Sequence, residues 1–235
     1  MMAGDKGQSG CALPEDMRRY YLDVMGVQMW QPLERQLEDS GSPMPAGGEK
    51  IWRQLERAVA QCTQCELHAT RTQTVFGTGD PDADLLIIGE APGRDEDLQG
   101  EPFVGRAGQL LNAMLAAIGY QRKQVYIANI LKCRPPNNRD PREEEAAACN
   151  GWLQQQIELI QPHVILALGR IAAHKLLNTD QSLGALRTRQ HKYTGIPLIV
   201  TYHPAYLLRQ PIDKRKSWQD LKRVRGLLNS YGGST

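Results

Sequence analysis

Four short apolar runs, each followed by a polar loop and a helical pattern, recur along the chain from residue 84 onward. They cover residues 84–89, 125–130, 163–168 and 197–202. Apolar residues at helical spacing follow the first three runs. These helical patterns lie at 109–118, in the segment that ends at residue 160, and at 169–177. Strands that alternate with helices form parallel sheets covered on both faces. The pattern therefore predicts a three-layer α/β/α fold around a central, mainly parallel, four-stranded sheet.

The N-terminal part has a different pattern. Residues 1–12 are rich in Gly, Ser and Lys, a composition typical of disorder. An amphipathic helix is predicted next, with Pro14 at its start and Gly26 at its end. Its apolar face could pack on its own domain or on a partner. The stretch SGSPMPAGG has the composition of a linker. We therefore expect a tail and arm at 1–39, a linker at 40–48 and a domain at 49–235.

Composition limits the class of protein. A chain of 235 residues suits one domain with an appendage. The net charge of +2 gives no global basic field, so a nucleic-acid surface would have to be a local patch. No apolar run approaches the length of a membrane span, and no signal peptide is recognisable. We expect a cytoplasmic protein with no membrane partner.

The stretch at 84–111, DLLIIGEAPGRDEDLQGEPFVGRAGQLL, combines a strand, a glycine-containing turn, an acidic run and a helix start. Such a loop lies at the carboxyl edge of a parallel sheet, where open α/β folds bind ligands. GEAPG lacks the GxGxxG spacing, so an ordinary turn or a degenerate nucleotide loop are alternatives. The acidic run could equally be a solvated surface.

Four of the five cysteines occupy positions that suggest a metal site. Cys62 and Cys65 form a CxxC pair, Cys133 follows the second strand, and Cys149 lies on a predicted helix. Four thiols can join segments that are distant in sequence. The spacing alone does not separate zinc from an iron-sulfur cluster. Cys11, in the tail, is expected to be a bystander.

The motifs CTQCEL, GEAPGRDEDLQGEPFVGRAGQLL, NILKCRPP, AAAC and HPAYLL resemble those of the family 4 uracil-DNA glycosylases, the iron-sulfur branch of that superfamily. The resemblance runs from residue 62 to about residue 208. It implies the uracil-DNA glycosylase fold and a structural [4Fe-4S] cluster. The cluster ligands would be Cys62, Cys65, Cys133 and Cys149.

The resemblance also implies an activity: flipping uracil out of DNA and hydrolysing its N-glycosidic bond, which leaves an abasic site without lyase chemistry. Phe103 would stack on the base, Asn129 would pair with its N3–H and O4, and His203 would donate to O2 as the base leaves. The main chain would contact uracil at Glu90, Ala91 and Pro92. From the residues alone, core packing remains an alternative for Phe103, and a structural role for Asn129.

Further roles follow from the same resemblance. Glu96 would position the attacking water. Leu207 and Leu208 would fill the hole left by the flipped base, although two leucines after a strand are also common in cores. Arg209 would reach a phosphate, and Arg134 would line the DNA.

The N-terminal arm resembles the arm of the psi subunit of the bacterial replicase, which docks on the clamp loader while the psi body holds the chi subunit. The proposed contact residues are Arg18, Tyr21, Leu22, Val27 and Trp30, which match that arm or supply aromatic anchors. The arm would tether the enzyme to the replication machinery. The alternative is a psi-type accessory subunit whose glycosylase-like body is a scaffold that binds chi.

Overall fold

The computed structural model describes residues 48–232. The predicted arm at 1–39, with its contact residues Arg18, Tyr21, Leu22, Val27 and Trp30, lies outside the described residues. So does Cys11. Within the described part, no helix is both long and apolar enough to cross a bilayer.

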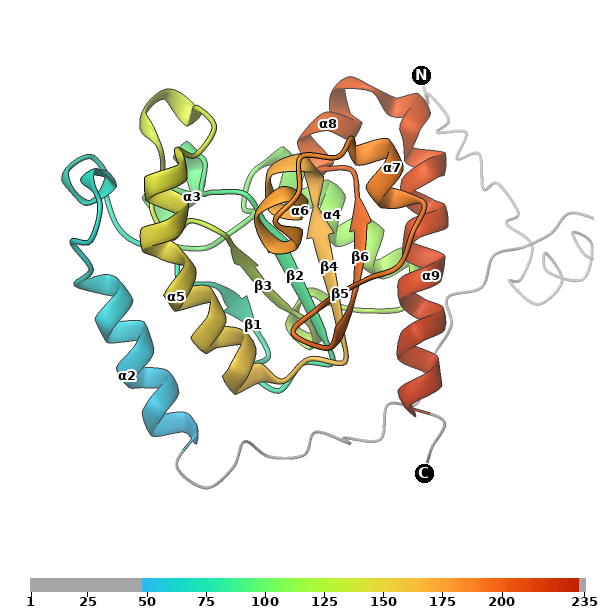
Figure 1. Cartoon of the computed structure of the whole chain (residues 1–235), viewed down its shortest axis with the longest axis horizontal. Helices are drawn as coiled ribbons and strands as arrows, with labels where there is room; N and C mark the ends of the chain where they lie inside the picture. Colours follow the sequence, from blue (N-terminus) through green and yellow to red (C-terminus); the bar gives the residue numbers. More distant parts are fainter. Residues whose placement is uncertain (1–47, 233–235) are drawn as a thin grey trace, which may run out of the picture. The chain divides into compact units, whose positions relative to one another are not determined.

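A six-stranded mixed sheet forms the centre of the domain (Figure 1). Its strands are β1 (Thr78–Gly79), β2 (Leu85–Gly89), β3 (Tyr126–Asn129), β4 (Val164–Leu168), β5 (His191–Tyr193) and β6 (Ile196–Thr201). The strand order is β1-β3-β2-β4-β6-β5, and the four inner strands run parallel. These four are the predicted strands, so the parallel sheet is confirmed.

The two edge strands, which pair antiparallel, were not predicted. β1 is only two residues long and contains a glycine, so it carries no period-2 pattern. β5 pairs with β6 across the turn residues Thr194 and Gly195, which both have positive φ. A two-residue turn of this kind joins hairpin strands, and the Thr-Gly pair was the available signal.

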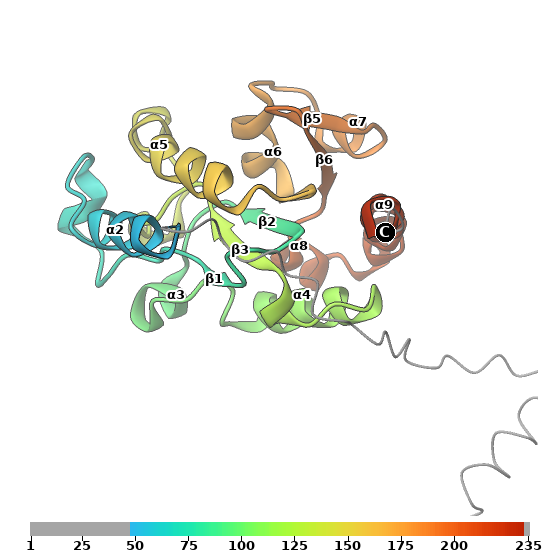
Figure 2. The same ribbon diagram turned by 90° about the horizontal axis from the view of Figure 1, so that it is seen from below.

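Helices cover both faces of the sheet (Figure 2). The α-helices are α2 (Gly48–Ala60), α3 (Arg94–Gln99), α4 (Arg106–Ala117), α5 (Glu143–Ile160), α6 (Gly169–Leu177), α7 (Leu183–Arg187), α8 (Pro204–Arg209) and α9 (Lys214–Gly232). Short 3-10 turns are η1 (Glu66–Ala69), η2 (Arg122–Gln124), η3 (Pro136–Asn138) and η4 (Pro211–Asp213). Helices α5, α6 and α7 pack on one face, and α4, α8 and α9 on the other.

Alternation along the strands separates these two cores. In β2, Leu86 and Ile88 join the core beneath α5 and α6, whereas Leu85 and Ile87 join the core beneath α4 and α9. All residues of β2 and β4 are buried because helices cover both sides. The predicted three-layer architecture is confirmed.

Helix α2 is attached outside α5 by a smaller apolar cluster. Leu55 and Val59 pack with Phe76, and the Trp52 ring meets the Phe76 and Tyr126 rings edge-on at centroid distances of 5.2 Å. This contact brings the CxxC pair, which follows α2, close to α5. The parallel strands meanwhile end together on the face that carries the loops and α8.

Candidate active site

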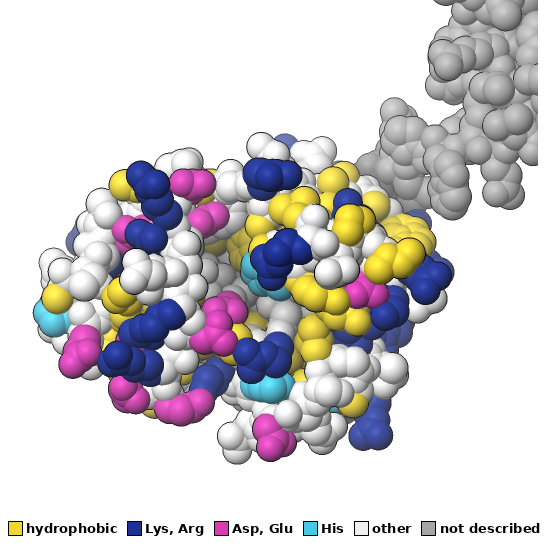
Figure 3. Space-filling model, turned by 90° about the horizontal axis from the view of Figure 1, so that it is seen from above, with side chains coloured by type: hydrophobic (Ala, Val, Ile, Leu, Met, Phe, Trp, Pro, Cys, Tyr) yellow, Lys and Arg dark blue, Asp and Glu magenta, His cyan; other side chains and the backbone are white. Residues whose placement is uncertain are grey.

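A cavity of about 470 Å³ opens at the carboxyl ends of the parallel strands. It is lined by three of the predicted residues, Phe103, Asn129 and His203, which come from three separate segments. Glu90, Ala91, Pro92, Glu96 and Arg209 line it as well. Seen from this side, the surface is hollowed near its middle, and basic side chains stand around the hollow (Figure 3).

Phe103 forms part of the cavity wall in an unusual backbone conformation. Its φ is +54°, and only 7% of its surface is exposed. Non-glycine residues rarely adopt positive φ, and such outliers cluster at ligand sites. The Phe103 ring lies 5.5 Å from the His203 ring between centroids, at an interplanar angle of 32°. A planar ligand could therefore contact both rings.

Asn129 is the last residue of β3 and is 2% exposed. Its neighbour in the sheet register is Gly89, the last residue of β2. The Oδ1 atom of Asn129 has no hydrogen-bond partner among the described residues. Because a buried acceptor without a donor costs free energy, this atom marks the place of a donor on a bound ligand.

His203 is the N-cap of α8, and its Nδ1 atom accepts a hydrogen bond from the Ala205 backbone N–H at 3.2 Å. Since Nδ1 accepts, the proton of the neutral ring is on Nε2. Burial, assisted by the charge of Arg209, lowers the pKa of His203 to about 4. The ring is therefore neutral near pH 7 and offers one donor, the Nε2–H group.

Glu90 follows β2 directly and lines the same cavity. Burial and the negative charge of Asp140 raise the pKa of its carboxyl to about 7, while Arg170 opposes the shift. No hydrogen bond is recorded for this carboxyl among the described residues. A carboxyl that titrates near neutrality inside a cavity is a candidate for acid-base chemistry.

Glu96 makes contacts that differ from those expected of it. One carboxylate oxygen accepts the backbone N–H of Gly93 at 3.1 Å. The other accepts the N–H groups of Val104 and Gly105 at 3.0 and 3.3 Å. These contacts join two loops of the cavity and fix the carboxylate in its lining. Because an ionised carboxylate has about four acceptor sites, the role of Glu96 in orienting a water stays a prediction.

Both leucines of HPAYLL lie on helix α8, but their side chains have different surroundings. Leu207 is 1% exposed and packs in the core beneath α4 and α9, so the prediction that it contacts DNA is wrong. Leu208 is half-buried, and Arg209 is exposed beside the cavity. A short helix that buries one side of the segment explains this difference. Sequence inspection placed both leucines on a loop.

The four predicted thiols line a second, smaller cavity between α2 and α5. Cys62, Cys65, Cys133 and Cys149 are all free there. Three of their sulfurs accept hydrogen bonds: Cys133 from the Arg71 guanidinium at 3.1 Å, Cys62 from the Trp152 indole at 3.4 Å, and Cys149 from the Lys132 backbone N–H at 3.3 Å. Such donors are typical around ligating sulfurs.

The identity of a bound metal group is not fixed by the thiols' positions. Among residues 48–232, no three His, Cys, Asp or Glu side chains are grouped closely enough to hold a metal ion. A tetrahedral zinc site needs its ligands around a single ion. A four-iron cluster instead gives each thiolate its own iron. Four thiols are a donor set that either group could use.

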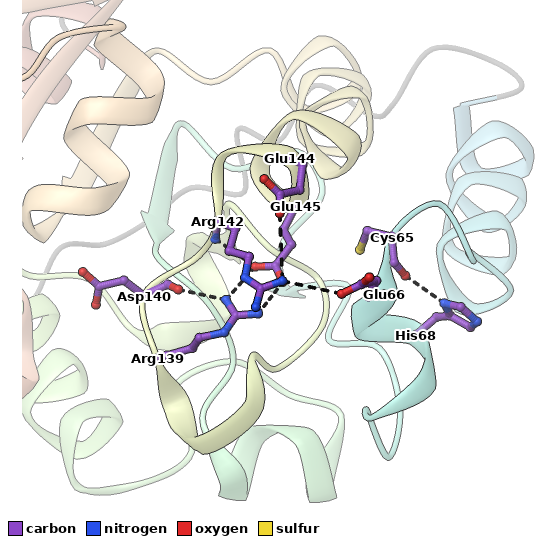
Figure 4. Close-up of polar contacts among 8 residues, drawn as sticks. All are labelled: Cys65, Glu66, His68, Arg139, Asp140, Arg142, Glu144 and Glu145. Carbon is purple, nitrogen blue, oxygen red and sulfur yellow. Dashed lines mark hydrogen bonds and ion pairs between the residues drawn. The ribbon is translucent and has the colours of Figure 1, made fainter.

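The loop between Cys133 and α5 and the start of α5 carry a network of polar contacts that reaches the residue after Cys65 (Figure 4). Arg139 makes a two-pronged contact with the Glu145 carboxylate at 2.8 and 2.5 Å. Arg142 pairs with Glu66, next to Cys65, at 3.5 Å. Arg134, expected to line DNA, donates to Asn138 Oδ1 at 2.7 Å on the same loop. Arg139 and Asn138 line the large cavity.

Sequence reasoning missed other cavity residues. Tyr206, one residue before Leu207, also lines the large cavity, and its hydroxyl donates to Asp213 at 2.7 Å. Its place in HPAYLL was the available signal. Pro135 also lines it, and its place in NILKCRPP was the available signal. Asn138 lies two residues after that motif, and no pattern in the sequence distinguished it from ordinary loop residues.

Comparison with known proteins gives consistent matches. Residues 76–222 match the family model described as the uracil DNA glycosylase superfamily. A type-4 uracil-DNA glycosylase of Archaeoglobus fulgidus is 44% identical over 178 residues, which cover 72% of this chain and 89% of the relative. One of Thermotoga maritima is 40% identical, covering 78% of this chain and 98% of the relative. The chain belongs to the uracil DNA glycosylase superfamily and, within it, to the type-4 family.

Proposed function

We propose that this protein is a monofunctional uracil-DNA glycosylase that acts on a flipped uracil in the large cavity. One observation carries the proposal: the buried, unpaired Oδ1 of Asn129 faces a cavity that also contains the Phe103 ring and the Nε2–H donor of His203. An acceptor, an aromatic face and a donor are the groups that a uracil base needs. The type-4 relatives carry this activity in their names.

Base recognition begins with Asn129. Its Oδ1 would accept the N3–H of uracil, and its amide N–H would donate to O4. Cytosine presents the opposite pattern, with an acceptor at N3 and a donor at N4, so it would leave buried polar groups unpaired. Mismatches of this kind give strong rejection. Phe103 would stack on the base, which contributes about 1–3 kcal/mol toward the cost of flipping.

Bond cleavage needs stabilisation of the leaving base. As the N-glycosidic bond lengthens, negative charge builds on uracil, and the Nε2–H of His203 would donate to O2. A fixed donor in a dry cavity stabilises such charge without reorganisation. The neutral ring has its proton on the required nitrogen, because Nδ1 is occupied by the Ala205 N–H.

A carboxylate would face the sugar as positive charge develops there and would orient the attacking water. Glu96, held by main-chain amides in the cavity lining, is one candidate for this role, and Glu90, whose pKa is raised to about 7 in the same cavity, is a second. The main chain at Ala91 and Pro92 would contact the base from the same loop. Product release then leaves an abasic site.

On the DNA side, Leu208 would fill the space vacated by the base, and the exposed Arg209 would reach a phosphate. Arg134 would contact the backbone from the loop after Cys133. Arg209 lines the large cavity, Leu208 precedes it on α8, and Arg134 precedes the lining residue Pro135. The arrangement is suited to a flipped-out nucleotide.

Excision from an oligonucleotide with one uracil tests the proposal. Uracil should be released, and the matched cytosine oligonucleotide should remain intact. His203→Asn should lower the single-turnover rate about 100-fold or more. The control is His163→Asn, since His163 is exposed, pairs with Asp84 and lies outside the cavity. Absence of release by wild-type protein in excess over substrate would reject the function.

We also propose that the four thiols hold a [4Fe-4S] cluster. The shared cavity, the three donors onto sulfur and the mixed origin of the ligands support this assignment. The cluster would join three chain segments rather than take part in chemistry, because hydrolysis transfers no electrons. Iron and acid-labile sulfide in equal amounts, about four of each per chain, would support it, and stoichiometric zinc would refute it.

The N-terminal arm remains a proposal from the sequence. Its resemblance to the psi arm supports a tether to the clamp loader. The intact set of Phe103, Asn129 and His203 disfavours the alternative, a scaffold for the chi subunit, which would not need those groups. Deleting residues 1–45 should abolish binding to the clamp loader and spare excision. Unchanged binding would refute the tether.

A further inference from the structure

The backbone at Phe103 lies in a region that an aromatic residue does not adopt without support. Its φ of +54° belongs to the left-handed region, and neither neighbour is a glycine. Residues in this conformation persist only when their surroundings fix them. The ring position in the cavity therefore depends on groups that hold the Phe103 peptides.

Arg122 supplies the contacts on the carbonyl side. It comes from the short turn η2, just before β3, and contacts the main chain at 102–103. Its guanidinium donates to the Pro102 carbonyl at 2.5 Å and to the Phe103 carbonyl at 3.5 Å. A third bond, to Asn112 Oδ1 at 3.4 Å, ties the same guanidinium to α4. Two successive carbonyls are thus held by one planar group.

Glu96 supplies the contacts on the amide side. Its carboxylate accepts the N–H groups of Val104 and Gly105, the two residues after Phe103. Arg122 and Glu96 together form a clamp, which we define as these two side chains and the peptides at 102–105.

The packing of α4 shows how closely the clamped segment is seated. A Cβ added to Gly108 would lie 1.6 Å from the Phe103 carbonyl oxygen. The Phe103 carbonyl oxygen therefore packs against α4 at Gly108, where there is no room for a side chain. Rotation of the Phe103 peptide would break this contact and the Arg122 bond at once, and it would move the ring.

We propose that Arg122 is a positioning residue for uracil excision, acting through Phe103 by holding the Pro102 and Phe103 carbonyls. The inference rests on the proposed function, because it gives the ring a role only where a base stacks on it. Arg122 does not itself line the cavity, and it reaches the lining only through the Phe103 main chain. Without it, the segment relaxes and the ring no longer presents its face to the base.

A double-mutant cycle tests this route. Arg122→Ala should lower the single-turnover rate of excision about tenfold. In a Phe103→Ala background the same change should cost less than twofold, since the ring it positions is gone. Arg122→Lys, which keeps the charge but loses the fork, should recover only part of the rate. Lys123→Ala is the matched control: it removes a charge from the adjacent exposed position and should leave the rate unchanged.

Equal losses in both backgrounds would show that Arg122 acts elsewhere, for example on a phosphate, and would overturn the proposal. No loss in the Phe103-containing background would overturn it too. Neither result would affect the proposed function, which the wild-type rate decides separately.

Hydrogen exchange provides a readout that needs no activity. The amides of Val104 and Gly105 should exchange faster in Arg122→Ala than in wild type or Lys123→Ala, because one side of the clamp is lost. If wild-type protein released no uracil, the proposed function would fail while this measurement still decided the clamp. Unchanged exchange at both amides would overturn the clamp.

Discussion

At the scale of single residues, the cavity contains two titratable groups whose pKa values burial shifts in opposite directions. It raises the pKa of the Glu90 carboxyl to about 7 and lowers that of His203 to about 4. Both shifts favour the neutral form of each group. Above neutral pH the cavity therefore contains a carboxylate and a neutral imidazole, the pair that the proposed mechanism uses.

This pair predicts the pH dependence of excision. Below its pKa the Glu90 carboxyl is protonated and cannot orient water or face positive charge, so the rate should rise with pH through about 7. His203 should add no inflection between pH 5 and 8, because its pKa is about 4. Single-turnover rates across that range measure the profile. Glu90→Gln should be about 100-fold slower and flat, and a variant with the wild-type inflection would contradict the assignment.

Gly89 gives a second prediction at this scale. A Cβ there would lie 2.3 Å from Asn129 Oδ1 and 2.6 Å from the Phe103 ring. Gly89→Ala should therefore displace both residues and lower the excision rate at least tenfold. Overpacking costs about 1–3 kcal/mol, so thermal unfolding should show a modest loss of stability. Gly151→Ala, with nothing within 4 Å of its Cβ on α5, is the control. Wild-type rates for Gly89→Ala would contradict the prediction.

Residue identities were easier to predict than residue roles. Phe103, Asn129 and His203 were found from motifs and do share one cavity. The main-chain contacts of Glu96 and the raised pKa of Glu90 could not be predicted. They depend on burial and on which amides a folded loop turns toward a carboxylate. Arg122 was missed for the same reason, since it lies nineteen residues from Phe103 in sequence.

At the scale of elements, a buried polar link joins β3 to α5. The Lys132 ammonium donates to the Asn129 carbonyl at 3.1 Å and to Gln156 Oε1 at 2.5 Å. Gln156 Nε2 donates in turn to the Phe76 carbonyl at 3.0 Å. Both side chains are almost fully buried, so each polar atom depends on its partner. The link ties the end of the strand that carries Asn129 to the helix that carries Cys149.

Breaking this link should destabilise the domain. Lys132→Met removes the donor and leaves the Asn129 carbonyl and Gln156 Oε1 unpaired, at a cost of about 1–3 kcal/mol for each buried group. Adding Gln156→Leu should cost less than the sum of the two single changes, because the unpaired amide is removed as well. Thermal unfolding of preparations with equal iron content would measure this. Additive losses would show that the two side chains act independently.

The helices and strands that extend over many residues agree with those predicted from the hydrophobic pattern. The four inner strands were predicted from continuous apolar runs, and the long helix α5 from apolar residues at helical spacing. Short elements were not: β1 and β5 have two and three residues, and α8 has six. Such lengths are set by tertiary contacts, as for α8, where Leu207 turns to the core.

At the scale of the whole molecule, the proposed cluster would join, through the four thiols, segments that are distant in the sequence. Cys62 and Cys65 follow α2, Cys133 follows β3, and Cys149 lies within α5. Burial raises the pKa of Cys149 to about 11 and also raises that of Cys133. Without bound metal the Cys133 and Cys149 thiols therefore stay protonated at neutral pH. Metal binding therefore releases protons and contributes to folding.

Cys149→Ser should remove this cross-link while leaving the large cavity intact. We expect loss of bound iron and of visible absorption, a lower melting temperature, and faster proteolysis of the segment at 62–72, which then lacks its attachment to α5. Excision per folded molecule should remain close to wild type, because no cysteine lines the large cavity. Cys11→Ser, at a thiol outside the predicted ligand set, should change none of these properties. A Cys149→Ser protein with wild-type iron content would refute the ligand assignment. A fully folded variant that had lost excision would instead give the cluster a part in the reaction, since only a direct effect on the cavity could separate activity from folding.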